Sequence, residues 1–133
     1  MIKLFIGAKG SGKTKTLIEL VNNAASSSNG AGVCIEKGDK LRFDVTSKAR
    51  LIDTDYYNIT NAEKLTGFIA GILASNSDIT DIFVDSSLKI CGNDVEAFEV
   101  LLKDVEKLVA DVNVVMTVSI ATETCPESIK AYT

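Results

Sequence analysis

Apolar and polar positions at the start of the chain change from the spacing of a strand to that of a helix. Residues 1–6 form a short apolar run, and a glycine-rich segment follows it. From Lys13 onward, the apolar residues that share one helical face are Leu17, Leu20, Val21 and Ala24. Residues 26–30, which are Ser, Asn and Gly, are expected to end this helix. The pattern therefore predicts a strand, a loop and an amphipathic helix, in that order.

Further segments along the chain have the composition of strands. Residues 33–35 are a buried-type run, and a tight Lys-Gly-Asp-Lys turn leads from it into residues 41–45, so we predict a hairpin here. Residues 49–53 are a shorter candidate. Residues 82–84 are an apolar run that Asp85 follows, and residues 112–120 are the longest strand predicted. The predicted strands are thus spread over the whole chain.

Two capping boxes mark the starts of further helices. Thr60 with Glu63 is the first, Asn93 with Glu96 is the second, and apolar residues at helical spacing follow each pair. Pro126 is expected to start a final helical turn. Strands that alternate with helices over 133 residues predict a single α/β domain, residues 1–133, with a mainly parallel sheet. Ligands bind such sheets at the carboxyl ends of the strands.

Composition excludes several classes of function. The chain has 14 Lys and Arg against 18 Asp and Glu, a net charge of −4, so general nucleic-acid binding is not expected. Histidine is absent, which removes Ser–His–Asp and Cys–His catalysis and every His-based metal site. The three cysteines form no C-x-x-C pair and are expected to be small buried hydrophobes. With no apolar run of membrane-spanning length, these features predict a cytoplasmic protein without membrane association.

The glycine-rich segment fits the pattern G-x-x-x-x-G-K-[ST] at every position. Its residues are Gly7, Ala8, Lys9, Gly10, Ser11, Gly12, Lys13 and Thr14. Glycines permit positive φ and close backbone approach, so that consecutive N–H groups can face phosphate oxygens. Lys13 brings positive charge to the β- and γ-phosphates, and the Thr14 hydroxyl is suited to ligate Mg²⁺. The helix that begins here adds the positive end of its dipole.

In this strand–loop–helix unit the chain resembles the P-loop NTPase superfamily, in particular its RecA-like and KaiC-like members. It is also similar to small stand-alone bacterial P-loop proteins that sometimes carry a twitching-motility ATPase label. The resemblance implies a three-layer α/β fold with the P-loop strand central in the sheet. It places the 112–120 strand between the P-loop strand and the strand that ends at Asp85. The implied cofactors are ATP and Mg²⁺.

The resemblance also implies two acidic site residues. Asp85 follows residues 82–84 and matches a Walker B aspartate that holds Mg²⁺ with Thr14; the alternative is a turn cap with the serines that follow it. Ser86 stands where many P-loop ATPases carry a catalytic glutamate. RecA-like proteins place that base at the end of the strand after the P-loop helix, and Glu36 matches this position. The alternative for Glu36 is a solvated residue at the end of a hairpin.

Other polar residues have two interpretations each. Asp53 and Asp55 either reach Mg²⁺ or a substrate hydroxyl, or serve turn chemistry. Thr117 and Ser119 end the last strand, either as sensors of the γ-phosphate or as hydroxyls that satisfy the backbone. Extra positive charge for phosphoryl transfer would come from one of four residues, each of which is otherwise a surface cation: Arg42, Arg50, Lys9 and Lys89.

The function expected from the sequence is Mg-ATP binding with slow hydrolysis, as a small ATPase or switch that acts with a protein partner or as a homo-oligomer. Lys13 and Glu36 are the expected catalytic residues. ATP is favoured over GTP because no N-K-x-D segment occurs. One alternative is a small-molecule kinase in which Asp53 or Asp55 orients the acceptor. The other is a nucleotide-binding module without catalysis, which Ser86 in place of glutamate favours.

Overall fold

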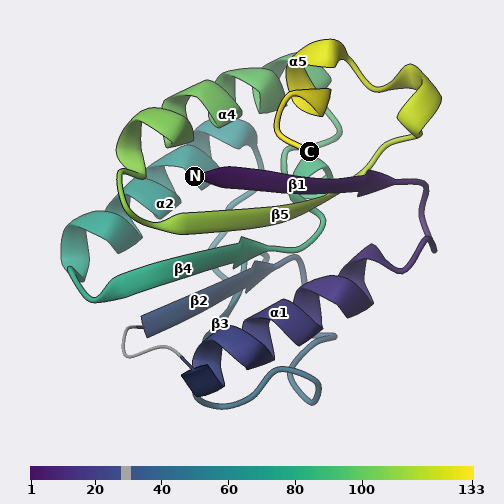
Figure 1. Cartoon of the computed structure of the whole chain (residues 1–133). Helices are drawn as coiled ribbons and strands as arrows, with labels where there is room; N and C mark the ends of the chain where they lie inside the picture. The colour runs from purple at the N-terminus through teal and green to yellow at the C-terminus, as the bar shows by residue number, and fades with distance from the viewer. Residues whose placement is uncertain (28–30) are drawn as a thin grey trace.

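The computed structural model describes residues 1–27 and 31–133 and contains one five-stranded sheet. Its strands are β1 (Ile2–Gly7), β2 (Ala31–Glu36), β3 (Arg50–Asp53), β4 (Ile79–Val84) and β5 (Asn113–Ser119). The order across the sheet is β1-β5-β4-β2-β3, and all neighbouring strands are parallel. The predicted α/β class with a parallel sheet is confirmed (Figure 1).

Helices cover both faces of the sheet and make three layers (Figure 1). On one face lies α1 (Lys13–Ser27), and on the other α2 (Ala62–Ser75) and α4 (Val95–Leu108) pack against each other. Two short helices complete the chain, α3 (Ser87–Ile90) and α5 (Glu127–Lys130), with a 3₁₀ turn at Thr122–Thr124. No helix in the described ranges has both the length and the hydrophobicity needed to cross a membrane.

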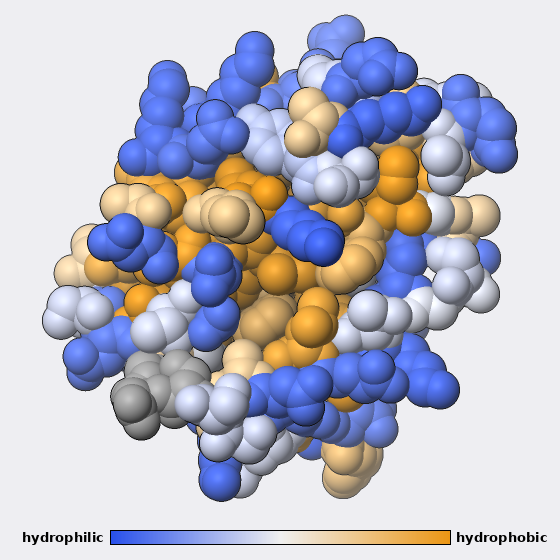
Figure 2. Space-filling model, viewed as in Figure 1, coloured by the Kyte–Doolittle hydropathy of each residue, from blue (hydrophilic) through white to orange (hydrophobic). Residues whose placement is uncertain are grey.

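Side chains alternate between the two faces of the sheet, as the pleat of a strand requires. Leu4, Val114 and Met116 belong to the large apolar cluster beneath α2 and α4. Cys34 and Phe83 face the other way, into a smaller cluster beneath α1. All three cysteines are buried, which confirms their interpretation as small hydrophobes. On the α1 side some apolar surface stays at the exterior, framed by hydrophilic residues (Figure 2).

One prediction about the sheet is wrong: β1, the P-loop strand of the sequence prediction, lies at an edge and not in the centre. A central position requires a further strand beyond β1. The residues after β5 instead form the 3₁₀ turn and α5, and the Leu4 N–H donates to the Tyr132 carbonyl at 2.9 Å, which partly covers the free edge. The predicted place of β5, between β1 and β4, is confirmed.

The predicted hairpin strand at residues 41–45 is also wrong. The N–H groups of Asp44 and Val45 both donate to the Leu41 carbonyl, so the segment turns upon itself. Leu41 and Val45 are buried in the cluster beneath α1. Two apolar residues four positions apart can lie on the same face of a helical turn. β2 pairs with β3 and β4, and not with residues 41–45 as a hairpin would require. The strand predicted at residues 49–53 is confirmed as β3. The predicted end of the first helix falls partly on residues 28–30, which lie outside the described residues.

Both helix caps lie one residue later than the capping boxes predicted. The side chain of Asn61 accepts from the Lys64 N–H at 2.8 Å, and that of Asp94 accepts from the Ala97 N–H at 3.1 Å. Asn93, the predicted cap, has a positive φ of 59° and lies in the turn before the helix. Helix starts are predictable from such sequences, but the capping residue itself depends on the entry angle of the chain.

We expect Asn61→Ala to lower the free energy of unfolding by about 1 kcal/mol, because it leaves the Lys64 N–H without its acceptor. Thr60→Ala is the matched control and should change stability by less than about 0.5 kcal/mol. Urea unfolding monitored by circular dichroism measures both. A larger loss of unfolding free energy for Thr60→Ala than for Asn61→Ala would show that Thr60, the residue predicted from the sequence, caps the helix.

Candidate functional site

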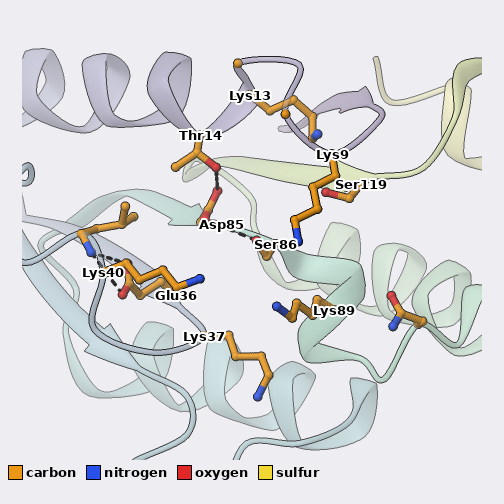
Figure 3. A pocket seen from close by; sticks show the side chains of 14 residues that line it. Lys9, Lys13, Thr14, Glu36, Lys37, Lys40, Asp85, Ser86, Lys89 and Ser119 are labelled. Atoms are coloured by element: carbon orange, nitrogen blue, oxygen red, sulfur yellow. Dashed lines mark hydrogen bonds between the residues drawn. The ribbon is translucent and has the colours of Figure 1, made fainter.

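A pocket of about 680 Å³ opens at the carboxyl ends of the parallel strands, where the α/β topology predicts a ligand site. Four separate segments line it: the loop after β1, the end of β2 with the turn that follows, the segment from the end of β4 through α3 to the turn after it, and the end of β5 (Figure 3). The lining residues are Lys9, Gly10, Gly12, Lys13, Thr14, Glu36, Lys37, Lys40, Leu41, Asp85, Ser86, Lys89, Asn93 and Ser119.

The glycine-rich loop connects β1 to α1 and forms one wall of this pocket. Gly10 and Gly12 have φ of 85° and 88°, the left-handed region that side chains disfavour, which explains why glycine stands at both positions. The Lys13 Nζ donates to the Ala8 carbonyl at 2.9 Å and to the Ser11 hydroxyl at 3.3 Å. Burial lowers the pKa of Lys13, and the nearby Asp85 carboxylate partly opposes this.

Thr14 and Asp85 meet at the base of the pocket, although 71 residues separate them in the sequence. The Thr14 Oγ1 donates to the Asp85 Oδ1 at 3.0 Å (Figure 3). Thr14 lies in the first turn of α1, and Asp85 directly follows β4. A hydroxyl and a carboxylate are oxygen ligands of the kind that Mg²⁺ prefers. The described residues contain no group of three or more acidic or thiol side chains for a metal, so an ion here would need ligands from a bound molecule as well.

Two residues from neighbouring elements hold the Asp85 carboxylate. The Thr117 Oγ1 donates to its Oδ1 at 2.8 Å and accepts from the Ser86 N–H at 2.7 Å, while the Ser86 hydroxyl donates to its Oδ2 at 3.3 Å. Ser86 has a positive φ of 57°, which turns the chain sharply after β4. Thr117 is therefore a buried hydroxyl that satisfies the backbone and Asp85, one of its two predicted interpretations, whereas Ser119 lines the pocket.

Glu36 ends β2 and lines the pocket, yet only 2% of its surface is exposed. The Leu41 N–H donates to both carboxylate oxygens, at 3.3 Å and 3.1 Å, which fixes the side chain (Figure 3). Burial raises the pKa of Glu36, the backbone N–H groups of Leu41 and Lys40 oppose the rise, and the charges of Asp85 and Asp53 add to it. A buried carboxylate whose pKa is raised takes up a proton more readily than a solvated one, which suits it as a proton acceptor.

The raised pKa of Glu36 predicts how stability depends on pH. The folded protein holds this proton more tightly than the unfolded chain, so the stabilisation is complete below the unfolded pKa and is lost as pH rises through the folded pKa. We expect the free energy of unfolding of the wild type, relative to that of Glu36→Gln, to fall as the pH rises above about 4, where the unfolded carboxyl begins to ionise. Denaturant titrations from about pH 4 to pH 7 measure this difference. A difference that rises with pH would contradict the direction given for the pKa.

Asp53 and Asp55 are not brought into the pocket. The Asp53 Oδ1 accepts from the N–H groups of Gly38 and Asp55, at 2.8 Å and 2.9 Å. Asp55 forms an ion pair with Lys37 at 2.6 Å. Both carboxylates thus serve the turns after β2 and β3, which agrees with the turn chemistry among their predicted interpretations, and neither lines the pocket.

Of the four residues predicted to supply positive charge, two line the pocket and two do not. Arg42 pairs with the exposed Asp39, and Arg50 starts β3 at the opposite end of the sheet, so neither arginine lines the pocket. Lys9 and Lys89 do line it. The sequence interpretation missed two further lysines, which are Lys37 and Lys40. Lys37 directly follows Glu36 and Lys40 lies four residues after it, which was the available signal, but the predicted hairpin assigned both lysines to a turn.

Comparison with known proteins adds no relative to this picture. No protein-family model matches the chain, and no curated protein matches it either. The arrangement of residues around the pocket, and not kinship, therefore supports what is concluded about function.

Proposed function

We propose that this protein is a P-loop nucleotide-binding protein of RecA-like type, which binds Mg-ATP in the pocket and hydrolyses it slowly. The observation that carries the proposal is the contact between Thr14 and Asp85, at 3.0 Å. The sequence resemblance assigned Mg²⁺ to these two residues. They are in contact where the G-x-x-x-x-G-K-[ST] loop passes into α1. The place of β5 between β1 and β4 also agrees with the resemblance.

Each residue of the site has a distinct role in this proposal. The backbone of the glycine-rich loop and Lys13 bind the phosphates, and the first turn of α1 adds its dipole. Thr14 and Asp85 would hold Mg²⁺, which supplies charge neutralisation to the phosphates when bound. Thr117 and Ser86 position the Asp85 carboxylate through the hydrogen bonds described above. The binding site is thus assembled from three strand ends.

Hydrolysis would use Glu36 as the proton acceptor. A water molecule attacks the γ-phosphorus, the bond from that phosphorus to the bridging oxygen breaks, and ADP leaves. Glu36 takes the proton of the attacking water, which its burial and raised pKa favour. No arginine of the described residues lines the pocket, so slow turnover is expected unless a protein partner or a second copy adds an arginine.

The test is a calorimetric titration of ATP, ADP and GTP, with and without Mg²⁺. We expect micromolar affinity for ATP, about −8 kcal/mol of binding free energy, strengthened about tenfold or more by Mg²⁺. In Asp85→Asn the Mg²⁺ effect should fall below about threefold, because the variant lacks the charged ligand. Asp81→Asn, in the first half of the strand that Asp85 follows and outside the pocket lining, is the matched control. An unchanged Mg²⁺ effect in Asp85→Asn would refute the metal assignment, and no binding by the wild type would refute the function.

A further inference from the structure

The pocket carries more positive charge than the composition of the chain predicts. Of the twelve lysines in the sequence, five line it, against two carboxylates, Glu36 and Asp85. The whole chain is acidic, with 14 Lys and Arg against 18 Asp and Glu. A cationic excess within a concave pocket raises the local concentration of anionic ligands. The pocket is therefore suited to bind an anionic ligand.

Two of the five lysines have partners already. The Lys13 Nζ donates to the Ala8 carbonyl within the glycine-rich loop and belongs to the phosphate site described above. The Lys37 Nζ pairs with Asp55 at 2.6 Å, and its side chain points away from the middle of the pocket (Figure 3). These two lysines do not account for the excess charge.

The other three lysines, Lys9, Lys40 and Lys89, are called here the lysine cluster. Within residues 1–27 and 31–133, their side chains have no ion pair and no hydrogen bond. They come from three different segments, which are the glycine-rich loop, the turn after β2, and α3. Lys9 and Lys89 point toward the middle of the pocket from opposite sides, and Lys40 extends past Glu36 (Figure 3). Three unpaired ammonium groups thus surround one space.

The rest of the lining shows that this space suits a second charged group better than a nucleotide base. Among the residues that the structure describes, no aromatic one lines the pocket and Leu41 is the single large apolar one, so a base would find no stacking surface there. The triphosphate already has the loop backbone, Lys13 and Mg²⁺, which leaves Mg-ATP with roughly two negative charges. The lysine cluster is then in excess of what the triphosphate requires.

We infer that the lysine cluster is a second anion subsite, which holds the phosphate group of a small phosphorylated molecule beside the bound nucleotide. The inference rests on the proposed function, since that function assigns the nucleotide to the glycine-rich loop. Lysine binds phosphate as a point charge, and three such charges match a phosphate dianion better than a carboxylate. A pocket of about 680 Å³ lies within the usual range for small-molecule sites.

The test uses inorganic phosphate as the probe. Wild-type protein is saturated with Mg²⁺ and a non-hydrolysable ATP analogue, and phosphate is then titrated calorimetrically at constant ionic strength. We expect phosphate to bind the loaded protein, and Lys40→Ala and Lys89→Ala each to weaken it about threefold to tenfold. Their affinity for the analogue should change by less than about threefold. Lys103→Ala, an exposed lysine on α4, is the charge-matched control and should leave both affinities unchanged.

Three results would overturn the inference. They are competition between phosphate and the analogue for one site, equal phosphate affinity in the wild type and the Lys40→Ala/Lys89→Ala double variant, and acetate binding as tight as phosphate. A failure of the proposed function is distinguishable, because then the analogue itself does not bind the wild type. Phosphate is in that case titrated into the nucleotide-free protein. Phosphate binding that is weakened by Lys40→Ala and Lys89→Ala but not by Lys13→Ala supports the subsite. Phosphate binding that neither Lys40→Ala nor Lys89→Ala weakens overturns it.

Discussion

Lys13→Ala is expected to weaken ATP binding about hundredfold in the presence of Mg²⁺. Lys13 is the loop lysine, its amino group lies against Ala8 and Ser11, and its proposed role is to donate to the phosphate oxygens. Hydrogen bonds between charged groups contribute about 1.5–3 kcal/mol each, so the loss of this donor corresponds to one to two orders of magnitude in affinity. Calorimetric titration of Mg-ATP into both proteins measures the difference directly.

The control for this prediction has to separate the position of the charge from its removal. Lys103→Ala removes the same charge from an exposed position on α4 and is expected to change ATP affinity by less than about twofold. Thermal unfolding should show that Lys13→Ala is folded, because the hydrogen bonds it loses are at the surface. If both variants bound ATP as the wild type does, the glycine-rich loop would not be the phosphate site.

Glu36→Gln is expected to lower the turnover number about hundredfold or more, with little effect on ATP affinity. General-base catalysis contributes on the order of 10²–10⁴ in rate, and glutamine keeps the shape of the side chain but cannot take up the proton. The amide oxygen of the glutamine can still accept from the Leu41 N–H, so the turn should keep its conformation. Release of inorganic phosphate under saturating Mg-ATP measures turnover, and calorimetry measures affinity.

Glu99→Gln provides the matched control, since Glu99 lies on α4 and does not line the pocket. Its turnover should equal that of the wild type. Equal turnover in Glu36→Gln would remove Glu36 from the chemistry and leave a role in holding the turn at Leu41. A drop in affinity with unchanged turnover would instead mean that Glu36 contributes to binding of the ground state.

Local signals in the sequence are sufficient to predict the strand–loop–helix unit and the strand that ends before Asp85. The change from an apolar run to helical spacing at Lys13 predicts α1, and the structure starts that helix at the same residue. The three apolar residues before Asp85 predict a strand that ends there, and the end of β4 confirms it. Such features depend on a few neighbouring residues, so they are encoded locally. The pairing of Asp85 with Thr14 was expected only from the resemblance to P-loop proteins, and the two side chains are in contact.

The sequence did not predict which strand lies at the edge of the sheet or what the 41–45 segment does. The edge position of β1 depends on the last residues of the chain, where the Tyr132 carbonyl bonds to Leu4. Residues 41–45 have apolar character that suits a strand, but burial of Leu41 and Val45 beneath α1 makes them a turn. Non-local packing decides both outcomes, and a single sequence contains no direct measure of it.

Short patterns in the sequence predict the parallel α/β class and the glycine-rich loop with Lys13 and Thr14, whereas Glu36 and Asp85 became candidates through the resemblance to P-loop proteins. The folded chain sets which of the charged residues share one space. The carboxylates of Asp53 and Asp55 bind within the turns after β2 and β3, whereas five lysines line one pocket. The reason is physical: parallel strands end at one edge of the sheet, so residues far apart in sequence meet there, and the turns between them set which side chains point inward.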